Sequence, residues 1–271
     1  MAIYESKLSR WPVPFESLYV QTHYGSTHVV ISGDPSNPAL ILLPGLAVTS
    51  MMWLPNIRAL SNQFRCFALD VIGDHGKSRL SEQKVYPRSG KDYSLWLKQV
   101  YDGLGLSESY LVGASNGGYA AINHALYAPE QVSKLILMAP SGIELSLKRV
   151  LPKIFYYLAF PTVENRKNLS NWFLGNDQNV REAFDQQMIL GMQIMPKVPI
   201  PLLISSKQLG MIQMPVMVIL GEKDPTLSAK EAVERIQTNI SQVKTVVIPD
   251  VGHVINYEAE KIVENLILDF L

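Results

Sequence analysis

Short apolar runs rich in β-branched residues recur along the chain, separated by clusters of glycine, proline and polar residues. Two nearby runs, Leu18–His23 and Ser26–Ile31, flank Gly25, and this arrangement predicts an antiparallel hairpin near the N-terminus. Six later runs are continuously apolar rather than alternating, which is typical of parallel strands covered on both faces. These six predicted strands are Ala39–Leu43, Arg65–Leu69, Ser109–Val112, Leu135–Met138, Val216–Leu220 and Lys244–Ile248.

Segments with helical spacing of apolar residues lie between several of these strands. Asp92 can cap a helix of this kind. The alanine-rich segment Asn116–Ala128 ends before Pro129, a common stop signal, and Glu258–Leu271 carries its apolar residues on one side. Strands that alternate with helices predict βαβ units with right-handed crossovers, and therefore an α/β fold with a mostly parallel, doubly wound sheet.

One connection is much longer than the others. Roughly 75 residues separate the last two predicted strands from those before them, whereas short loops or single helices suffice elsewhere. The interval contains several prolines and two apolar-aromatic segments, Val150–Phe160 and Leu169–Leu174, which predict helices. We interpret residues 141–213 as a helical cap inserted into a core formed by residues 1–140 and 214–271. A second independent domain is the alternative, but the interval is short for a hydrophobic core of its own.

Composition narrows the classes of protein further. The 271 residues are 47% apolar and 18% charged, which predicts a folded chain rather than a disordered one. The 24 basic and 24 acidic residues balance, so we expect no nucleic-acid partner. Cys66 is the only cysteine, so no intramolecular disulfide can form. The segment Met1–Pro14 has no apolar region typical of a signal peptide, and no apolar run approaches the roughly 20 residues of a membrane span. We therefore expect a cytoplasmic protein without a membrane partner.

The chemistry that the sequence predicts centres on Ser115. The segment Gly113-Ala114-Ser115-Asn116-Gly117 fits the pattern G-x-S-x-G. A predicted strand ends just before it, and a predicted helix begins at Asn116. This strand–turn–helix context is typical of a nucleophile elbow, a sharp turn that holds a serine above the sheet. Glycine is expected at both ends of the motif because neighbouring backbone approaches too closely for a Cβ.

With this motif in place, the chain resembles the α/β-hydrolase fold superfamily over essentially its whole length. In that family the acid and then the histidine follow the serine along the chain. Asp224 lies directly after the predicted strand Val216–Leu220, and His253 follows the last predicted strand. The resemblance implies that Ser115 is the nucleophile, that His253 accepts its proton, and that Asp224 orients His253 and stabilises its charged form.

Other carboxylates and histidines leave alternatives open. Asp250 lies three residues before His253, and Glu144 follows the strand after the elbow strand, a position that some family members use for the acid. His75 lies in a loop after a central strand and could approach the pocket. We interpret the remaining histidines as structural; they are His23, His28 and His124.

The oxyanion that forms during acyl transfer needs preorganised donors. The resemblance implies two backbone N–H groups, those of Asn116, directly after the nucleophile, and of Leu46, in the loop after the strand Ala39–Leu43. Family members usually have His-Gly where this chain has Pro44 and Gly45. The Leu46 N–H is a backbone group and is still available with Pro44 at this position. The histidine side chain that would support the loop in family members is missing.

Several further segments resemble bacterial carboxylesterases of the NP type. They are Trp11–Val13, Gly25–His28, Met52–Ile57, Asp70–Asp74, Asn176–Val180 and Gly252–Val254. This likeness implies hydrolysis of a small-molecule ester without a cofactor. No metal-ligand spacing or phosphate-binding glycine motif occurs in the sequence, so we predict neither a cofactor nor a metal. The same triad also serves carbon–carbon-bond hydrolases, thioesterases and perhydrolases, and a non-catalytic ligand receptor on this scaffold is the alternative from another class.

The predicted cap is rich in aromatic and thioether side chains. Because it leaves the sheet directly after the strand that follows the elbow strand, we expect it to close over Ser115 and to contribute an apolar pocket. The pocket predicts a preference for compact hydrophobic or aryl esters. The side chains concerned are Phe155, Tyr156, Tyr157, Phe160, Trp172, Phe173, Met188, Met192 and Met195.

Overall fold

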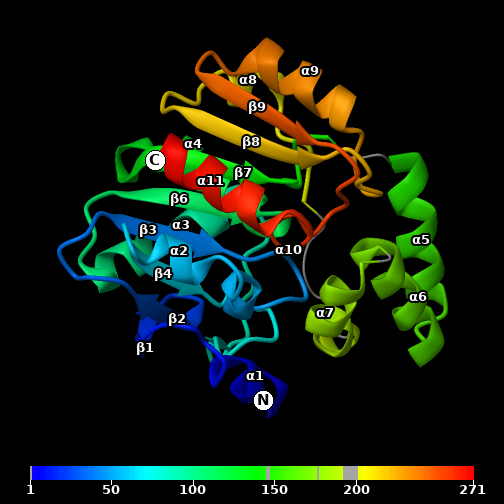
Figure 1. Cartoon of the computed structure of the whole chain (residues 1–271), viewed down its shortest axis with the longest axis horizontal. Coiled ribbons are helices and arrows are strands. Elements are labelled where there is room, and N and C mark those ends of the chain that lie inside the picture. Colours follow the sequence, from blue (N-terminus) through cyan, green and yellow to red (C-terminus); the bar gives the residue numbers. More distant parts are fainter. Residues whose placement is uncertain (1, 145–146, 176, 192–200) are drawn as a thin grey trace.

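A single mixed β-sheet organises the molecule (Figure 1). The computed structural model describes residues 2–144, 147–175, 177–191 and 201–271. Within them the sheet has nine strands, in the order β1-β2-β4-β3-β6-β7-β8-β9, with β5 paired to β2. The strands are β1 Phe15–Thr22, β2 Gly25–Ser32, β3 Ala39–Leu43, β4 Arg65–Leu69, β5 Arg79–Leu80, β6 Ser109–Ala114, β7 Val132–Met138, β8 Val216–Gly221 and β9 Val243–Ile248.

Strand direction in the sheet matches the prediction from the apolar runs. β2 pairs antiparallel with both β1 and β4, whereas β4, β3, β6, β7, β8 and β9 pair in parallel. The continuous apolar runs of the central strands are buried on both faces, as a covered parallel sheet requires. β9 departs from this pattern: Lys244 and Val247 are exposed because β9 forms the edge of the sheet. The predicted N-terminal hairpin and mostly parallel sheet are confirmed.

Helices cover both faces of the sheet, with α2 and α11 on one face and α3 and α4 on the other (Figure 1). The helices of the sheet domain are α1 Ala2–Leu8, α2 Ile57–Leu60, α3 Gly90–Leu104, α4 Asn116–Tyr127, α8 Ser206–Leu209, α9 Ala229–Asn239, α10 Ile255–Glu258 and α11 Glu260–Phe270, with 3₁₀ turns η1 Ser50–Trp53 and η2 Pro129–Gln131. The parallel strands all end at the edge where the loops after β3, β4, β6, β8 and β9 converge.

The start of α3 differs from the prediction. Asp92 was expected to cap the helix, but the N-cap is Ser89, and α3 begins at Gly90. The Ser89 hydroxyl accepts a hydrogen bond from the Asp92 N–H (3.2 Å), and the Asp92 carboxylate accepts one from the Ser89 N–H (2.9 Å). This reciprocal pair, a capping box, satisfies two N–H groups at the start of the helix. Asp92 therefore contributes to the cap as the third residue of the first turn and is not itself the N-cap.

The segment between β7 and β8 is helical, as predicted, and lies beside the ends of the parallel strands (Figure 1). It contains α5 Leu147–Ala159, α6 Val163–Leu174 and α7 Gln178–Gly191. α6 begins before the predicted Leu169 because the Thr162 hydroxyl caps it, accepting from the Asn165 N–H (3.1 Å). The two ends of the segment are tied together: the Ile204 N–H donates to the Gly142 carbonyl (2.8 Å).

Candidate active site

Ser115 occupies a strained turn between β6 and α4. Its φ of 50° and ψ of −116° lie in a region that side chains other than glycine rarely adopt. The turn is held by its backbone, since the Ser115 N–H donates to the Met138 carbonyl (2.9 Å) and the Ser141 N–H donates to the Ser115 carbonyl (3.0 Å). The predicted strand–turn–helix geometry is therefore present at Ser115.

The two glycines of the motif allow close backbone contact. A Cβ on Gly113 would lie 2.5 Å from the Gly117 carbonyl oxygen, and a Cβ on Gly117 would lie 2.4 Å from that of Pro44. Both distances are far below van der Waals contact. A larger residue at Gly113 would therefore displace the start of α4, and one at Gly117 would displace the loop after β3. The same loop lies against the serine: a Cβ on Gly45 would be 3.3 Å from the Ser115 Cβ.

His253 and Asp224 converge on Ser115 from two other strand ends. His253 Nε2 lies 3.1 Å from Ser115 Oγ, and His253 Nδ1 lies 2.7 Å from Asp224 Oδ2. The other oxygen of Asp224 accepts hydrogen bonds from the N–H and the hydroxyl of Thr226, each at 2.7 Å. Asp224 is 3% exposed, and the His253 side chain is 11% exposed. The structure thus brings all three predicted side chains into one hydrogen-bonded series.

Electrostatics favour an ionised acid beside a basic imidazole. Burial disfavours the charged form of His253, but the Asp224 carboxylate, its hydrogen bond and nearby Glu258 outweigh burial and hold the pKa of His253 above its ordinary value. Burial acts to raise the pKa of Asp224, whereas the charge of His253 and hydrogen bonds from His253 and Thr226 lower that pKa below its ordinary value. Asp224 is therefore ionised at neutral pH, and His253 is a better proton acceptor than an isolated imidazole.

The alternative acids lie elsewhere. Asp250 is 80% exposed at its side chain and pairs with Lys223 (2.5 Å). Glu144 accepts a hydrogen bond from the Ser228 N–H (2.7 Å) at the start of α9. Neither carboxylate is the partner that the structure gives to the ring of His253.

The oxyanion donors predicted from the sequence flank the serine. Asn116 is the first residue of α4, and the first N–H groups of a helix have no partner within the helix. Leu46 directly follows Gly45, the residue that approaches Ser115. Both N–H groups thus belong to backbone that borders the nucleophile.

The helical segment between β7 and β8 contacts the site through α6 and α7. The Phe173 ring lies 6.0 Å from the His253 ring, centroid to centroid. On α7, Gln187 donates to the Thr49 hydroxyl (3.0 Å) in the loop after β3. Three aromatic residues expected to contribute to the pocket are instead largely exposed on the outer side, namely Phe155, Tyr156 and Phe160 at 75%, 56% and 57%. Met192 and Met195 lie outside the described residues.

A second serine–histidine–aspartate series lies under the N-terminal helix α1. Ser17 Oγ on β1 lies 2.6 Å from His28 Nε2, and His28 Nδ1 lies 3.1 Å from Asp70 Oδ2. The Asp70 carboxylate also accepts from the N–H and hydroxyl of Ser50 and from the Lys77 N–H. The sequence analysis identified His28 as structural but missed its partners, because Ser17 lies within a strand and belongs to no catalytic motif.

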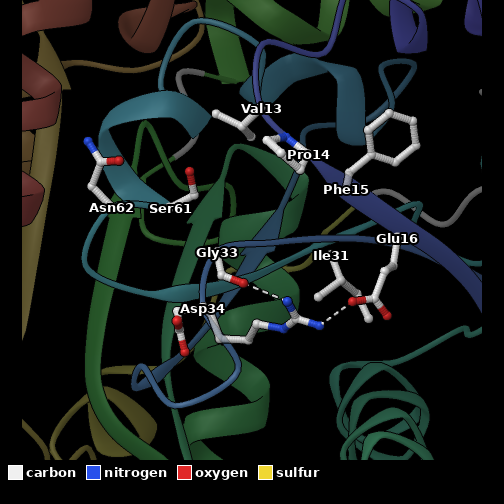
Figure 2. Close-up of a pocket in the computed structure, with 10 residues that line it drawn as sticks. Val13, Pro14, Phe15, Glu16, Ile31, Gly33, Asp34, Ser61 and Asn62 are labelled. Carbon is white, nitrogen blue, oxygen red and sulfur yellow. Dashed lines mark hydrogen bonds and ion pairs between the residues drawn. The ribbon is translucent and has the colours of Figure 1, made fainter.

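A second hollow of the molecule is a surface pocket of about 380 Å³, lined by residues from Val13 to Arg65 (Figure 2). It adjoins the starts of β1 and β4 and the end of β2, whereas Ser115 follows the end of a parallel strand. Its only guanidinium is already engaged: Arg65 donates to the Gly33 carbonyl and to Glu16 (2.8 Å). Ligands of open α/β sheets bind at the carboxyl ends of the strands, so this pocket is not the candidate active site.

Metal-binding clusters and membrane-spanning helices are both absent from the part of the chain that the structure describes. No group of three or more histidine, cysteine, aspartate or glutamate side chains there could hold a metal ion. Among the described helices, none is long and apolar enough to cross a membrane.

Comparison with known proteins places this fold and site in a family. Residues 38–193 match the family model described as the alpha/beta hydrolase fold, and the chain belongs to this family. Carboxylesterase YbfK of Bacillus subtilis (strain 168) is 31% identical over 277 aligned residues, which cover 99% of this chain and 92% of that protein. The uncharacterised carboxylesterase nap of the same strain is 32% identical, with 98% of this chain and 90% of that protein covered.

Solved structures show the same likeness in three dimensions. The crystal structure of carboxylesterase CesB (YbfK) from Bacillus subtilis superposes with a TM-score of 0.90 at 30% identity, covering 99% of this chain and 95% of that one. That of naproxen esterase (carboxylesterase NP) from Bacillus subtilis gives 0.89 at 29% identity, with the same coverage. The predicted likeness to carboxylesterases of the NP type is confirmed, and the chain is a hydrolase of ester bonds acting on small molecules.

Proposed function

We propose that Ser115, His253 and Asp224 form the catalytic triad with which this hydrolase cleaves carboxylic esters through an acyl-enzyme. The observation that carries the proposal is the unbroken series of contacts, 3.1 Å and 2.7 Å, that ends on a serine in a strained elbow. Strained backbone of this kind persists only where the surrounding structure enforces it, and it is concentrated at active sites and ligand-binding sites. A neutral serine hydroxyl needs an adjacent base to react at neutral pH, and His253 Nε2 is within hydrogen-bond reach.

The geometry supports the following sequence of steps. Ser115 Oγ attacks the ester carbonyl carbon as its proton passes to His253 Nε2. The tetrahedral intermediate then collapses, and the alcohol departs with that proton, which leaves the acyl group on Ser115. Water attacks the acyl carbon, gives a proton to His253, and Ser115 Oγ leaves with the proton to restore the enzyme. Throughout, the Asp224 carboxylate stabilises the transient imidazolium without itself taking a proton.

Two backbone donors complete the proposed site. The N–H groups of Asn116 and Leu46 stabilise the oxyanion, because each borders Ser115 and neither requires a side chain. A preorganised donor of this kind contributes on the order of 10²-fold to 10³-fold to the rate.

The substrate class that we infer is a compact, uncharged ester. Residues 141–213 act as the cap in this proposal, and Phe173 presents an aromatic ring beside His253, where an acyl or aryl group would lie. Trp172 packs on Phe173 with ring centroids 5.0 Å apart, which widens the apolar wall. We infer a cytoplasmic location, since the only cysteine, Cys66, is buried and unpaired, and no nucleic-acid partner, since the net charge is zero.

The test uses Ser115→Ala with Ser17→Ala as a matched control, because both serines bond to a histidine that bonds to an aspartate. A panel of p-nitrophenyl esters, thioesters, amides and carbon–carbon-bond substrates is measured with all three proteins. The proposal predicts that esters are the best substrates and that kcat falls by at least about 10³-fold in Ser115→Ala. Ser17→Ala is expected to stay within about twofold of the wild type. Equal losses in the two variants would contradict the assignment.

A further inference from the structure

The loop after β3 contains a strained residue next to the proposed oxyanion donor. Ala47, which directly follows Leu46, has a φ of 63°. In this left-handed region the Cβ of an alanine crowds the following carbonyl, so the conformation persists only if neighbouring groups hold it. The direction of the Leu46 N–H depends on that loop conformation, and therefore on whatever holds Ala47 in place.

A buried carboxylate from the loop after β4, that of Asp74, helps to hold Ala47 in this conformation. Asp74 Oδ2 accepts a hydrogen bond from the Ala47 N–H (2.9 Å), and the Asp74 side chain is 3% exposed. Asp74 Oδ1 accepts from the N–H of His75 (2.7 Å) and from its ring Nδ1 (2.9 Å). His75 thus fixes the position of Oδ1, and this orients Oδ2 toward the Ala47 N–H.

The helix α7 closes the other side of the same residue. A Cβ on Gly191, the last residue of α7, would lie 2.7 Å from the Ala47 carbonyl oxygen and 2.8 Å from its Cα. Ala47 is therefore enclosed between α7 and the Asp74 carboxylate. Pro44 and Gly45 earlier in the loop carry no side-chain hydrogen-bonding group. The Asp74 carboxylate therefore bonds the loop directly beside Leu46, whereas Gln187 bonds it farther along, at Thr49.

We propose that Asp74 is a positioning residue for catalysis, which holds the loop at residues 44–49 so that the Leu46 N–H points at the developing oxyanion. This inference rests on the proposed function, because it needs an oxyanion on a Ser115 adduct. Asp74 does not touch the substrate and acts only through Ala47. Asp74 is expected to lower the energy of the transition state more than that of the bound ester. The reason is that the carbonyl oxygen carries little charge until the oxyanion forms.

The first experiment measures kcat and KM for Asp74→Ala on a p-nitrophenyl ester. We expect kcat to fall by roughly 10-fold to 100-fold with KM within about threefold, a smaller loss than removal of an oxyanion donor itself. The affinity for a trifluoromethyl ketone, which forms a tetrahedral adduct, should fall by the same factor as kcat/KM. Asp74→Asn retains one acceptor oxygen for either Ala47 or His75, so its kcat should lie between wild type and Asp74→Ala.

The second experiment separates loop positioning from general destabilisation. Glycine adopts a positive φ without steric cost, so Ala47→Gly in the Asp74→Ala background should recover kcat by about fivefold or more. The control is Asp34→Ala. The Asp34 carboxylate accepts hydrogen bonds from the N–H and hydroxyl of Ser36 in the same turn, so its removal should leave kcat unchanged.

Several outcomes would overturn the inference. They are a wild-type kcat in Asp74→Ala, a loss confined to KM, or a loss that Ala47→Gly does not relieve. The two proposals fail separately. If Ser115→Ala keeps its activity, the triad is wrong, whereas an inactive Ser115→Ala beside a fully active Asp74→Ala would remove only the positioning role.

Discussion

Two serine–histidine–aspartate series in this molecule have similar distances but different surroundings. In the first, Ser115 lies 3.1 Å from a histidine that lies 2.7 Å from Asp224. In the second, Ser17 lies 2.6 Å from a histidine that lies 3.1 Å from Asp70. Side-chain identity and spacing alone therefore do not distinguish a reactive serine from a structural one.

The backbone around each serine makes the first difference. Ser17 lies within β1, in the regular register of a hairpin, so its neighbouring N–H groups point perpendicular to the strand, in the plane of the sheet. Ser115 lies at a positive φ at the start of α4, where unpaired helix N–H groups and the loop after β3 surround it. In the proposed site, the N–H groups beside Ser115 serve as oxyanion donors, a role that the extended backbone around Ser17 does not offer.

The carboxylates make the second difference. Besides its contact with His28, the Asp70 carboxylate accepts three hydrogen bonds, from the N–H and hydroxyl of Ser50 and from the Lys77 N–H, and thereby ties the end of β4 to η1. Asp224 bonds only to Thr226 and His253 and sits in a loop after β8. We infer that Asp70 stabilises the fold, whereas Asp224 supports the proposed base His253.

The largest expected effect separates these two aspartates. Asp224→Asn should lower kcat on the order of 10³-fold while leaving the midpoint of thermal unfolding close to that of the wild type, because its loop contributes little to the core. Asp70→Asn should cost about 2–4 kcal/mol of stability, since it weakens a buried hydrogen-bonded charge, with little loss of kcat in the protein that remains folded. Thermal unfolding and steady-state kinetics on both variants check this prediction.

Asp250→Asn serves as the control for the same experiment. Asp250 is exposed and pairs with Lys223, so both stability and kcat should stay near wild type. A loss in Asp250→Asn larger than that in Asp224→Asn would reassign the acid.

A smaller effect concerns pH. His253 must be neutral to accept the serine proton, and its pKa is raised, so kcat/KM should fall about tenfold per pH unit below a midpoint above the ordinary value of about 6.5. In Asp224→Asn the supporting charge is lost and burial remains, so the midpoint should move to lower pH. A midpoint that stays in place in Asp224→Asn would contradict the coupling between His253 and Asp224. A pH series of kcat/KM for both proteins provides the measurement.

The smallest effect is on acyl-chain preference. Each buried CH₂ contributes about 0.8 kcal/mol, so kcat/KM should rise severalfold per methylene until the pocket is full and then decline. Phe173→Ala should reduce that rise, because the ring beside His253 forms part of the apolar wall. Phe155→Ala, on the exposed outer side of α5, is the control. A flat profile across p-nitrophenyl esters, or a peak on long-chain emulsions, would contradict an enclosed pocket.

The sheet and the main site were predictable from sequence because both follow strong local signals. The six continuous apolar runs all became parallel strands, and Ser115, Asp224 and His253 each follow the end of one. Strand ends converge at one edge of a parallel sheet, so order along the chain was enough to bring these residues together.

Contacts between distant loops were not predictable in this way. The Asp74–Ala47 bond joins two loops, and the Ser17–His28–Asp70 series joins three strand or loop positions that carry no motif. The α7 helix is rich in polar residues, so its apolar positions give only a weak helical period. The exposure of Phe155 and Phe160 likewise depends on how α5 packs, which aromatic content does not show.

Covalent labelling by an organophosphate, followed by peptide mass spectrometry, tests directly whether Ser115 is the nucleophile. Two histidine-bonded serines compete for the reagent in one molecule, so the experiment carries its own control. The account predicts one phosphoryl group per chain, on Ser115, at a rate that matches the loss of esterase activity. Label on Ser17, or full activity after Ser115 is modified, would contradict it.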